Sequence, residues 1–246
     1  MNRIKIVQFQ IYLIDDYFSS NYTYYMGNQQ TKKYLQDKNK YYEINSFLKS
    51  NLEGHLNIDL ILNFKKIQGD DLQELCKGLE KCINVKTLMI SLYSCNLSNQ
   101  YLSSIANSFT NMVYLTHLKL RLGVNNIGQQ GVEDLGRVLI KFQKLQSVEL
   151  YFYSNKINDE GAYLLMNQLA QCQNISTLII EFTNNKIGDQ GILNIGQQLK
   201  RFTNLTTLML YLIENQIEEV RKEYLETISM KLKKLVSFSI ELISYE

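Results

Sequence analysis

The sequence has 246 residues, 45% of them hydrophobic and 20% charged, which is typical of a folded protein and excludes disorder as a description of the whole chain. Its 26 basic and 24 acidic residues leave a formal net charge of +2, which favours neither nucleic acid nor an anionic membrane as a partner. Four cysteines and two histidines fit neither a disulfide framework nor the spacing of zinc ligands, so we expect no metal, no cofactor and a reducing, cytoplasmic environment.

The first 57 residues differ in pattern from the rest of the chain. The run from Ile4 to Ile14 alternates like a strand, but Gln8 and Gln10 interrupt it and no cleavage site of a signal peptide follows. We expect residues 1–40 to form an N-terminal extension. Residues 41–57 should form an N-terminal cap that contains a short helix over residues 41–51. No stretch of the sequence is long and apolar enough to predict a membrane span.

From residue 58 onwards the sequence repeats every 30 residues. Three apolar columns lie two positions apart, as in Val148, Leu150 and Phe152, which is the period of a strand with one buried face. A segment with apolar residues at helical spacing precedes or follows each strand, for example Val132, Leu135, Leu139 and Phe142. Residues 58–246 should therefore hold six units of strand, turn and helix, followed by a terminal strand.

Strands that recur only after a helical crossover must pair in parallel. Packed helices lie about 8–10 Å apart and paired strands about 4.8 Å apart, so stacked units should spread on the helical side. The predicted fold is an α/β solenoid that curves into a horseshoe arc. Its parallel sheet should form the concave face, and its helices should form the convex face.

The repeat resembles the leucine-rich repeats of the ribonuclease-inhibitor type, whose unit reads roughly LxxLxLxxNxLxxxGxxxL. The resemblance covers residues 58–243, and the 30-residue unit is also similar to leucine-rich repeats of ciliated protozoa. One unit shows the match at Leu145, Val148, Leu150, Phe152, Asn155, Ile157, Gly161 and Leu165.

One polar position recurs within the repeat, as in the segments NKINDEG (155–161) and NKIGDQG (185–191). The resemblance implies that Asn or Cys at this position turns inward and bonds the backbone of neighbouring turns. An unpaired buried group costs about 1–3 kcal/mol, so this column should be structural. Lys65 occupies the position in the first unit and does not fit. The predicted ladder consists of Cys95, Asn125, Asn155, Asn185 and Asn215.

Residues that alternate with the buried strand columns must face the opposite side of the sheet. Tyr, Met and Arg are enriched at protein interfaces, so this surface is the candidate partner-binding site. The alternative explanation is that strands favour aromatic and β-branched residues on either face. The predicted site consists of Tyr93, Lys119, Arg121, Glu149, Tyr151, Tyr153, Ile179, Glu181, Met209, Tyr211 and Ile213.

No catalytic or nucleotide-binding motif is found, so the leading hypothesis is a non-catalytic module or scaffold that binds another protein. An alternative follows from a similarity to the Ran GTPase activators, which use this repeat and supply an arginine. Arg121 would be that residue here, although we expect it in mid-strand and the acidic tail of that family is absent. A third hypothesis is a structural subunit of a larger assembly, since the strand predicted at residues 238–242 leaves a bare edge.

Overall fold

The computed structural model of the chain describes residues 39–242. The strand predicted over residues 4–14, and nearly all of the predicted extension 1–40, lie outside this range. The strands are β1 (Lys40–Tyr41), β2 (Asn57–Ile61), β3 (Thr87–Ser91), β4 (His117–Arg121), β5 (Ser147–Tyr151), β6 (Thr177–Glu181), β7 (Thr207–Tyr211) and β8 (Ser237–Glu241).

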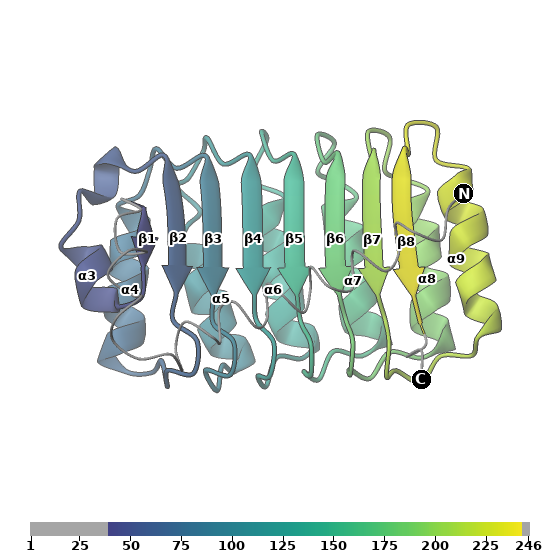
Figure 1. The fold of residues 1–246 in the computed structure, drawn as a ribbon, viewed down its shortest axis with the longest axis horizontal. Coiled ribbons are helices and arrows are strands. Elements are labelled where there is room, and N and C mark those ends of the chain that lie inside the picture. Colours follow the sequence, from purple (N-terminus) through teal and green to yellow (C-terminus); the bar gives the residue numbers. More distant parts are fainter. Residues whose placement is uncertain (1–38, 243–246) are drawn as a thin grey trace, which may run out of the picture. The chain divides into compact units, whose positions relative to one another are not determined.

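A helix joins each strand from β2 onwards to the next. These helices all lie on one face of the sheet (Figure 1). They are α4 (Asp70–Glu80), α5 (Asn99–Ser108), α6 (Gln129–Leu139), α7 (Asp159–Leu169), α8 (Asp189–Leu199) and α9 (Val220–Met230), and α3 (Ile44–Leu48) precedes them.

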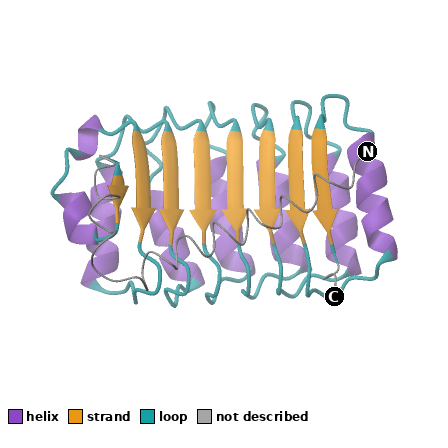
Figure 2. Ribbon diagram, viewed as in Figure 1, coloured by secondary structure: helices purple, strands orange, loops and turns teal. Residues whose placement is uncertain are grey.

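The strands follow one another in the sheet in chain order, and β2 to β8 pair in parallel (Figure 2). Ile58 pairs with Leu88, and Leu88 pairs with Leu118, so each strand is shifted from the last by one whole repeat. The same register continues through Leu208 and Phe238. The predicted α/β solenoid, with a parallel sheet on one side and helices on the other, is confirmed.

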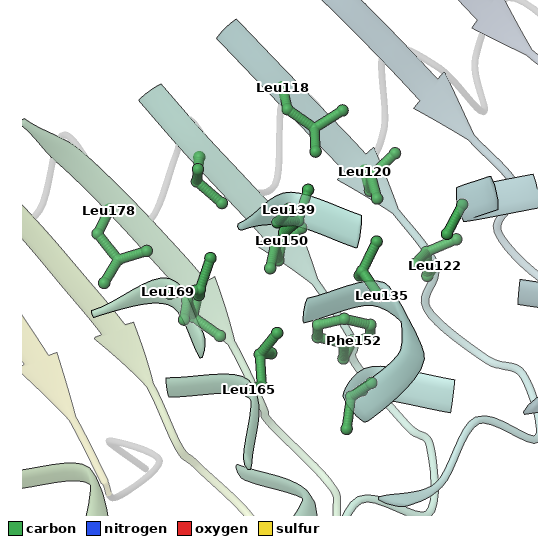
Figure 3. Close-up of a cluster of buried hydrophobic side chains, with 14 of the residues drawn as sticks. Leu118, Leu120, Leu122, Leu135, Leu139, Leu150, Phe152, Leu165, Leu169 and Leu178 are labelled. Carbon is green, nitrogen blue, oxygen red and sulfur yellow. The ribbon is translucent and has the colours of Figure 1, made fainter. Parts of the chain in front are cut away.

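The buried columns of the repeat meet the helices in one continuous core (Figure 3). Leu150 from β5 and Leu135 from α6 are completely buried. The rings of Phe152 and Phe182 stack with centroids 5.9 Å apart, so apolar contacts run from one unit into the next. Burying each such side chain contributes roughly 1.5–3 kcal/mol to the hydrophobic term.

The elements are shorter than the apolar columns predict. Each of the strands β2 to β8 has five residues, so Phe152 follows β5 and is buried in the turn after it. Phe142 likewise follows α6, where its amide donates to the carbonyl of Leu139 at 3.1 Å. The columns predict burial correctly, because a turn that packs on the core needs apolar residues as much as a strand does.

The N-terminal cap also differs from the predicted helix over residues 41–51, because α3 has five residues and a short 3₁₀ turn, Leu52–Gly54, follows it. Polar side chains end the helix. The Ser50 hydroxyl donates to the Phe47 carbonyl at 2.6 Å, and Asn51 Oδ1 accepts from the amide of Gly54. His55 Nε2 then lies 3.0 Å from the Tyr41 hydroxyl and 2.9 Å from that of Ser50, so hydrogen bonds hold the cap together.

The recurrent asparagines bond buried backbone groups of two adjacent units. Nδ2 of Asn155 donates to the carbonyls of Leu122, Phe152 and Tyr153 at 2.9, 3.1 and 3.3 Å. Its Oδ1 accepts from the amide of Ile127 at 3.0 Å. The corresponding side chains that bond the backbone in the same column are Asn125, Asn185 and Asn215.

The two N-terminal members of this column behave differently. The Cys95 thiol donates to the carbonyl of Leu62 at 3.1 Å, and burial raises its pKa to about 11. Lys65 turns away from the column, and its ammonium bonds the Tyr42 carbonyl at 2.6 Å and the Glu43 carboxylate at 2.7 Å. In the first unit, the contact of Lys65 with the cap therefore replaces the asparagine bonds.

A second recurrent feature is a left-handed residue just before the asparagine column. Val124, for example, has φ 55°, a region that is unfavourable for a β-branched side chain. The other residues of this column, all with φ between 52° and 61°, are Phe64, Ser94, Ser154, Asn184 and Glu214.

Asn155→Ala should lower the free energy of unfolding by about 1–3 kcal/mol, because it leaves the Ile127 amide without a partner and removes one of the two side-chain donors to the Leu122 and Phe152 carbonyls. Asn155→Cys should lower the free energy of unfolding by less, since a thiol can donate to a backbone carbonyl, as the Cys95 thiol does to the carbonyl of Leu62. The measurement is urea denaturation followed by circular dichroism. Lys156→Ala, at an exposed neighbour, is the control, and an equal loss in both variants would contradict the structural role.

Val124→Asn should raise the free energy of unfolding by about 1 kcal/mol, because Asn adopts a positive φ with less strain than Val. The reciprocal change, Asn184→Val at φ 52°, should lower it by a similar amount. Both side chains are exposed, so little burial is lost. Thermal denaturation of the two variants checks the pair, and a stability change of the same sign in both would show that backbone strain is not the cause.

Candidate functional site

The candidate site lies on the face of the sheet opposite the helices, which is turned toward the viewer in Figure 1 and is called the front face below. Every second side chain of each strand points to this face, because the residues between them point to the other side and are buried against the helices. The predicted residues on the front face of β4 to β7 are Lys119, Arg121, Glu149, Tyr151, Ile179, Glu181, Met209 and Tyr211.

Tyr93, Tyr153 and Ile213 were predicted as strand residues, and the structure places them two residues beyond the ends of β3, β5 and β7. Their carbonyls accept from a backbone amide in the corresponding turn of the preceding unit, as in the bond from the Val124 amide to the Tyr153 carbonyl at 2.7 Å. They border the front face rather than belonging to its strands. Arg121 was predicted in mid-strand, but it is the last residue of β4.

Tyr151 lies at the centre of a network of charged side chains on β4 and β5. Lys119 Nζ forms an ion pair with Glu149 Oε2 at 3.0 Å, and the Tyr151 hydroxyl donates to the same carboxylate at 3.0 Å. The Lys119 ammonium lies 5.3 Å from the centroid of the Tyr151 ring, and the Arg121 guanidinium lies 6.0 Å from it. Burial, followed by the Glu149 charge, raises the pKa of the Tyr151 hydroxyl, so Tyr151 is a neutral hydrogen-bond donor.

Glu181 is the carboxylate of β6 on the front face, next to Tyr151 in the register. Burial raises its pKa to about 7, and the nearby Arg121 charge offsets only part of that effect. Within residues 39–242, the ion pairs of the front face leave Glu181 without a cationic partner at contact distance. Glu181 is therefore charged only in part near neutral pH.

Tyr211 on β7 lies between two carboxylates in the register, Glu181 on β6 and Glu241 on β8. Its exposed fraction is 3%, and its hydroxyl lies 3.7 Å from the Met209 sulfur, a weak acceptor. Burial is also the main cause that raises the pKa of Glu241. Glu241 was absent from the predicted site, although it occupies the same column of the repeat as Tyr151 and Glu181.

The described residues offer little that could act as a nucleophile or hold a metal. Burial raises the pKa of Cys172 to about 11 and that of Cys82 to about 12, so neither is a thiolate at neutral pH. Over residues 39–242, no group of three or more His, Cys, Asp or Glu side chains is placed to hold a metal ion. In the same range, no helix combines the length and the apolar character that crossing a membrane requires.

The parallel strands, the crossover helices and the inward asparagine column together make this a leucine-rich repeat structure. No family model matches the chain, and no curated protein matches it. Among solved structures, the chain is similar to internalin C2 from Listeria monocytogenes, with 17% sequence identity and a TM-score of 0.41. The similarity covers 77% of this chain and 82% of the internalin chain. The fold is established by the repeat geometry itself.

The stability of the chain should depend on pH through Glu181. Its folded pKa of about 7 lies above the ordinary value of 4.5, so the folded state holds a proton that the unfolded state has lost between these two pH values. Stability should therefore fall as the pH rises through that window and should not recover above it. Glu181→Gln should remove part of the fall, leaving the contribution of Glu241.

Thermal denaturation of the wild type and Glu181→Gln at pH 5, 6, 7 and 8 tests this expectation. The variant's advantage should grow from pH 5 to pH 8. Glu160→Gln removes one charge from an exposed position of α7 and serves as the matched control. A Glu181→Gln variant with the wild-type pH dependence would show that the Glu181 carboxylate is ionised as readily in the folded state as in the unfolded state.

Proposed function

We propose that this chain is a non-catalytic module that binds a partner protein through its front face. The observation that carries the proposal is the set of contacts around Tyr151. An aromatic ring with two cations over it and a carboxylate on its hydroxyl is already fixed in position, so a partner would lose little side-chain entropy on binding it. Tyrosine and methionine beside such a group are the residues that protein interfaces favour.

The ribonuclease-inhibitor type of repeat is part of this proposal. It is supported by the 30-residue unit, and by the full α-helix that joins each pair of strands from β2 to β8. A cytoplasmic location is also proposed. The four cysteines, all of them free thiols, are what a reducing compartment would preserve.

The GTPase-activating alternative is less well supported than binding. An arginine that enters the active site of a GTPase must project from the surface and be able to reach a phosphate. Arg121 instead lies at the end of β4 with its guanidinium over the Tyr151 ring, and its charge acts on Glu181. These contacts favour a role for Arg121 within the front face.

A structural role in a larger assembly has one observation in its favour. Phe238 of β8 has an exposed fraction of 37%, whereas Leu208 and Leu178 in the same column are fully buried. Val236, just before β8, is 86% exposed. A neighbouring chain or a further repeat that covered these residues would bury them as the inner units do. This role is compatible with partner binding through the front face.

The triple variant Tyr151→Ala, Tyr153→Ala, Tyr211→Ala should lose the partner. Truncating interface anchors costs about 2 kcal/mol or more each, so affinity should fall by at least about 30-fold. The measurement is affinity purification from native cells with quantitative mass spectrometry, after circular dichroism has shown that the variant is folded. Tyr163→Ala, on the helical side in α7, is the control. If all three baits recover the same proteins, the front face is not the binding surface.

A further inference from the structure

The loops that follow helices α4 to α9 carry charge of a single sign. Each loop leads into the next strand, and together they form the edge of the solenoid at which the strands begin, the upper edge in Figure 1. This strand-entry edge consists of residues 81–86, 109–116, 140–146, 170–176, 200–206 and 231–236. It contains no acidic residue. Its nine basic residues are Lys81, Lys86, Lys141, Lys144, Lys200, Arg201, Lys231, Lys233 and Lys234.

All nine of these side chains are exposed, and none forms an ion pair within the described part of the chain. Arg201 donates at 2.6 Å to the side-chain oxygens of Asn167 and Gln198, which are neutral amides. Glu80 and Glu53 adjoin the edge at its N-terminal end. These two carboxylates offset only a small part of the positive charge, which therefore faces solvent.

The loops at the other edge, where the strands end, carry both signs of charge. They consist of residues 62–69, 92–98, 122–128, 152–158, 182–188 and 212–219. Their charged residues are Lys65, Lys66, Lys156, Lys186, Glu214, Glu218 and Glu219. The formal net charge of +2 therefore conceals a separation of charge. The expectation drawn from it about anionic partners applies to the chain as a whole and not to the strand-entry edge.

The helix dipole explains only some of these cations. A positive charge near the C-terminus of a helix is favourable, and Lys81 and Lys141 lie one and two residues beyond α4 and α6. The effect falls off within the last turn of the helix. It does not account for Lys86, Lys144 and Lys234, which lie four to six residues beyond their helices.

Exposed apolar side chains lie among the cations. Ile83, Val113 and Tyr114 are exposed in two adjacent loops, and Val113 has an exposed fraction of 60%. At the other end of the edge, Val236 is exposed, and so is Met230, the last residue of α9, with an exposed fraction of 68%. Single exposed apolar residues are normal on a protein surface, but these are concentrated where the unpaired cations are.

The fold does not require apolar side chains at these positions. Gln143 and Gln173 occupy the column of Val113, and Thr206 occupies the column of Val236. Each of these polar residues lies in a loop with the same backbone bond to its neighbour, such as the bond from the Thr206 amide to the Ser176 carbonyl at 2.8 Å. The apolar residues of the edge therefore call for an explanation other than stability.

We propose that the strand-entry edge binds the surface of a membrane that contains anionic phospholipids. The basic side chains pair with the phosphates and acidic headgroups, and Val113 and Met230 enter the boundary between the headgroups and the acyl chains. Tyr114 suits that boundary, because its ring is apolar and its hydroxyl is polar. The Lys144 ammonium lies 4.5 Å from the centroid of the Tyr114 ring, so a cation and a ring already lie side by side there.

The mixture of side chains selects a membrane over other polyanions. A nucleic acid binds through its phosphates and stacks its bases on aromatic rings, so exposed aliphatic side chains gain nothing from it. An acidic protein segment usually adds to an unpaired strand edge or fills a groove. The backbone of these loops is already paired with its neighbours, as in the bond from the Thr116 amide to the Lys86 carbonyl at 2.8 Å. A membrane surface accommodates both cations and apolar side chains along a continuous edge.

The test is co-sedimentation of the full 246-residue chain with vesicles of phosphatidylcholine that contain about 30% phosphatidylserine. Binding should be at least about tenfold stronger than to vesicles of phosphatidylcholine alone. Raising the salt concentration from about 0.1 M to about 0.5 M should weaken it, because the charges of this edge are exposed and are screened.

A charge-matched pair of variants should locate the contact. The triple variant Lys231→Gln, Lys233→Gln, Lys234→Gln should weaken binding to the anionic vesicles at least about tenfold. The control variant Lys66→Gln, Lys156→Gln, Lys186→Gln removes the same charge from exposed positions of the opposite edge and should bind as the wild type does. Circular dichroism checks that both variants are folded.

The depth of the contact can be measured with a single fluorophore, because the chain contains no tryptophan. The emission of Val113→Trp should shift to shorter wavelength with anionic vesicles and should be quenched by brominated lipids. Gln130→Trp, at an exposed position of α6 near the opposite edge, should show neither effect.

Equal binding to neutral and anionic vesicles, or equal binding by the two triple lysine variants, would overturn the inference. So would Val113→Trp emission that does not change with vesicles. Single-stranded RNA and polyglutamate are tested as competitors. If either binds the edge while vesicles do not, the partner is a polyanion of another class and the inference is wrong. The front face takes no part in these measurements, so their outcome is independent of the proposed function.

Discussion

The fold depends on pairing backbone groups that its turns would otherwise bury unpaired. After each strand the chain leaves the sheet and turns inward, and carbonyls at this turn accept from side chains of the asparagine column. Asn155 satisfies three of them and also bonds the Ile127 amide of the preceding unit. Because Asn155 bonds both units at once, it fixes their spacing and their register together. Burial of Phe152 against Phe182 then follows from a spacing that is already set.

The properties of the front face follow from this spacing. Strands held at a constant register bring Tyr151, Glu181 and Tyr211 into one row although they are 30 residues apart in sequence. The scaffold beneath them is a packed core, so the side chains above it cannot easily move apart to relieve their charges. The rigid repeat therefore holds Glu181 in a partly desolvated position, although desolvation of its carboxylate is unfavourable.

The repeat could be predicted almost completely from the sequence, because burial has a period and the period is visible in columns such as Ile58, Leu88 and Leu118. Strand ends could not, since Phe152 looks the same whether it is buried in a strand or in a turn. The cap helix was predicted too long because local side-chain bonds from Ser50 and Asn51 compete with helix formation. The charge balance around Glu181 depends on which carboxylate forms the ion pair with Lys119. The partner is Glu149, and no sequence pattern predicts that choice.

The core is formed by the buried columns of the repeat, and the front-face columns contribute little to it. Residues of the front face can therefore be substituted more freely than those of the core. A front-face residue such as Ile179 or Met209 lies between buried columns that it does not help to form. Each can be replaced without altering the register that places its neighbours. Each position of the front face is therefore defined by its strand and by its column in the repeat, and the two vary independently. Substitutions could therefore accumulate on the front face one residue at a time. A lineage could change its binding surface in this way while the buried columns keep the fold stable.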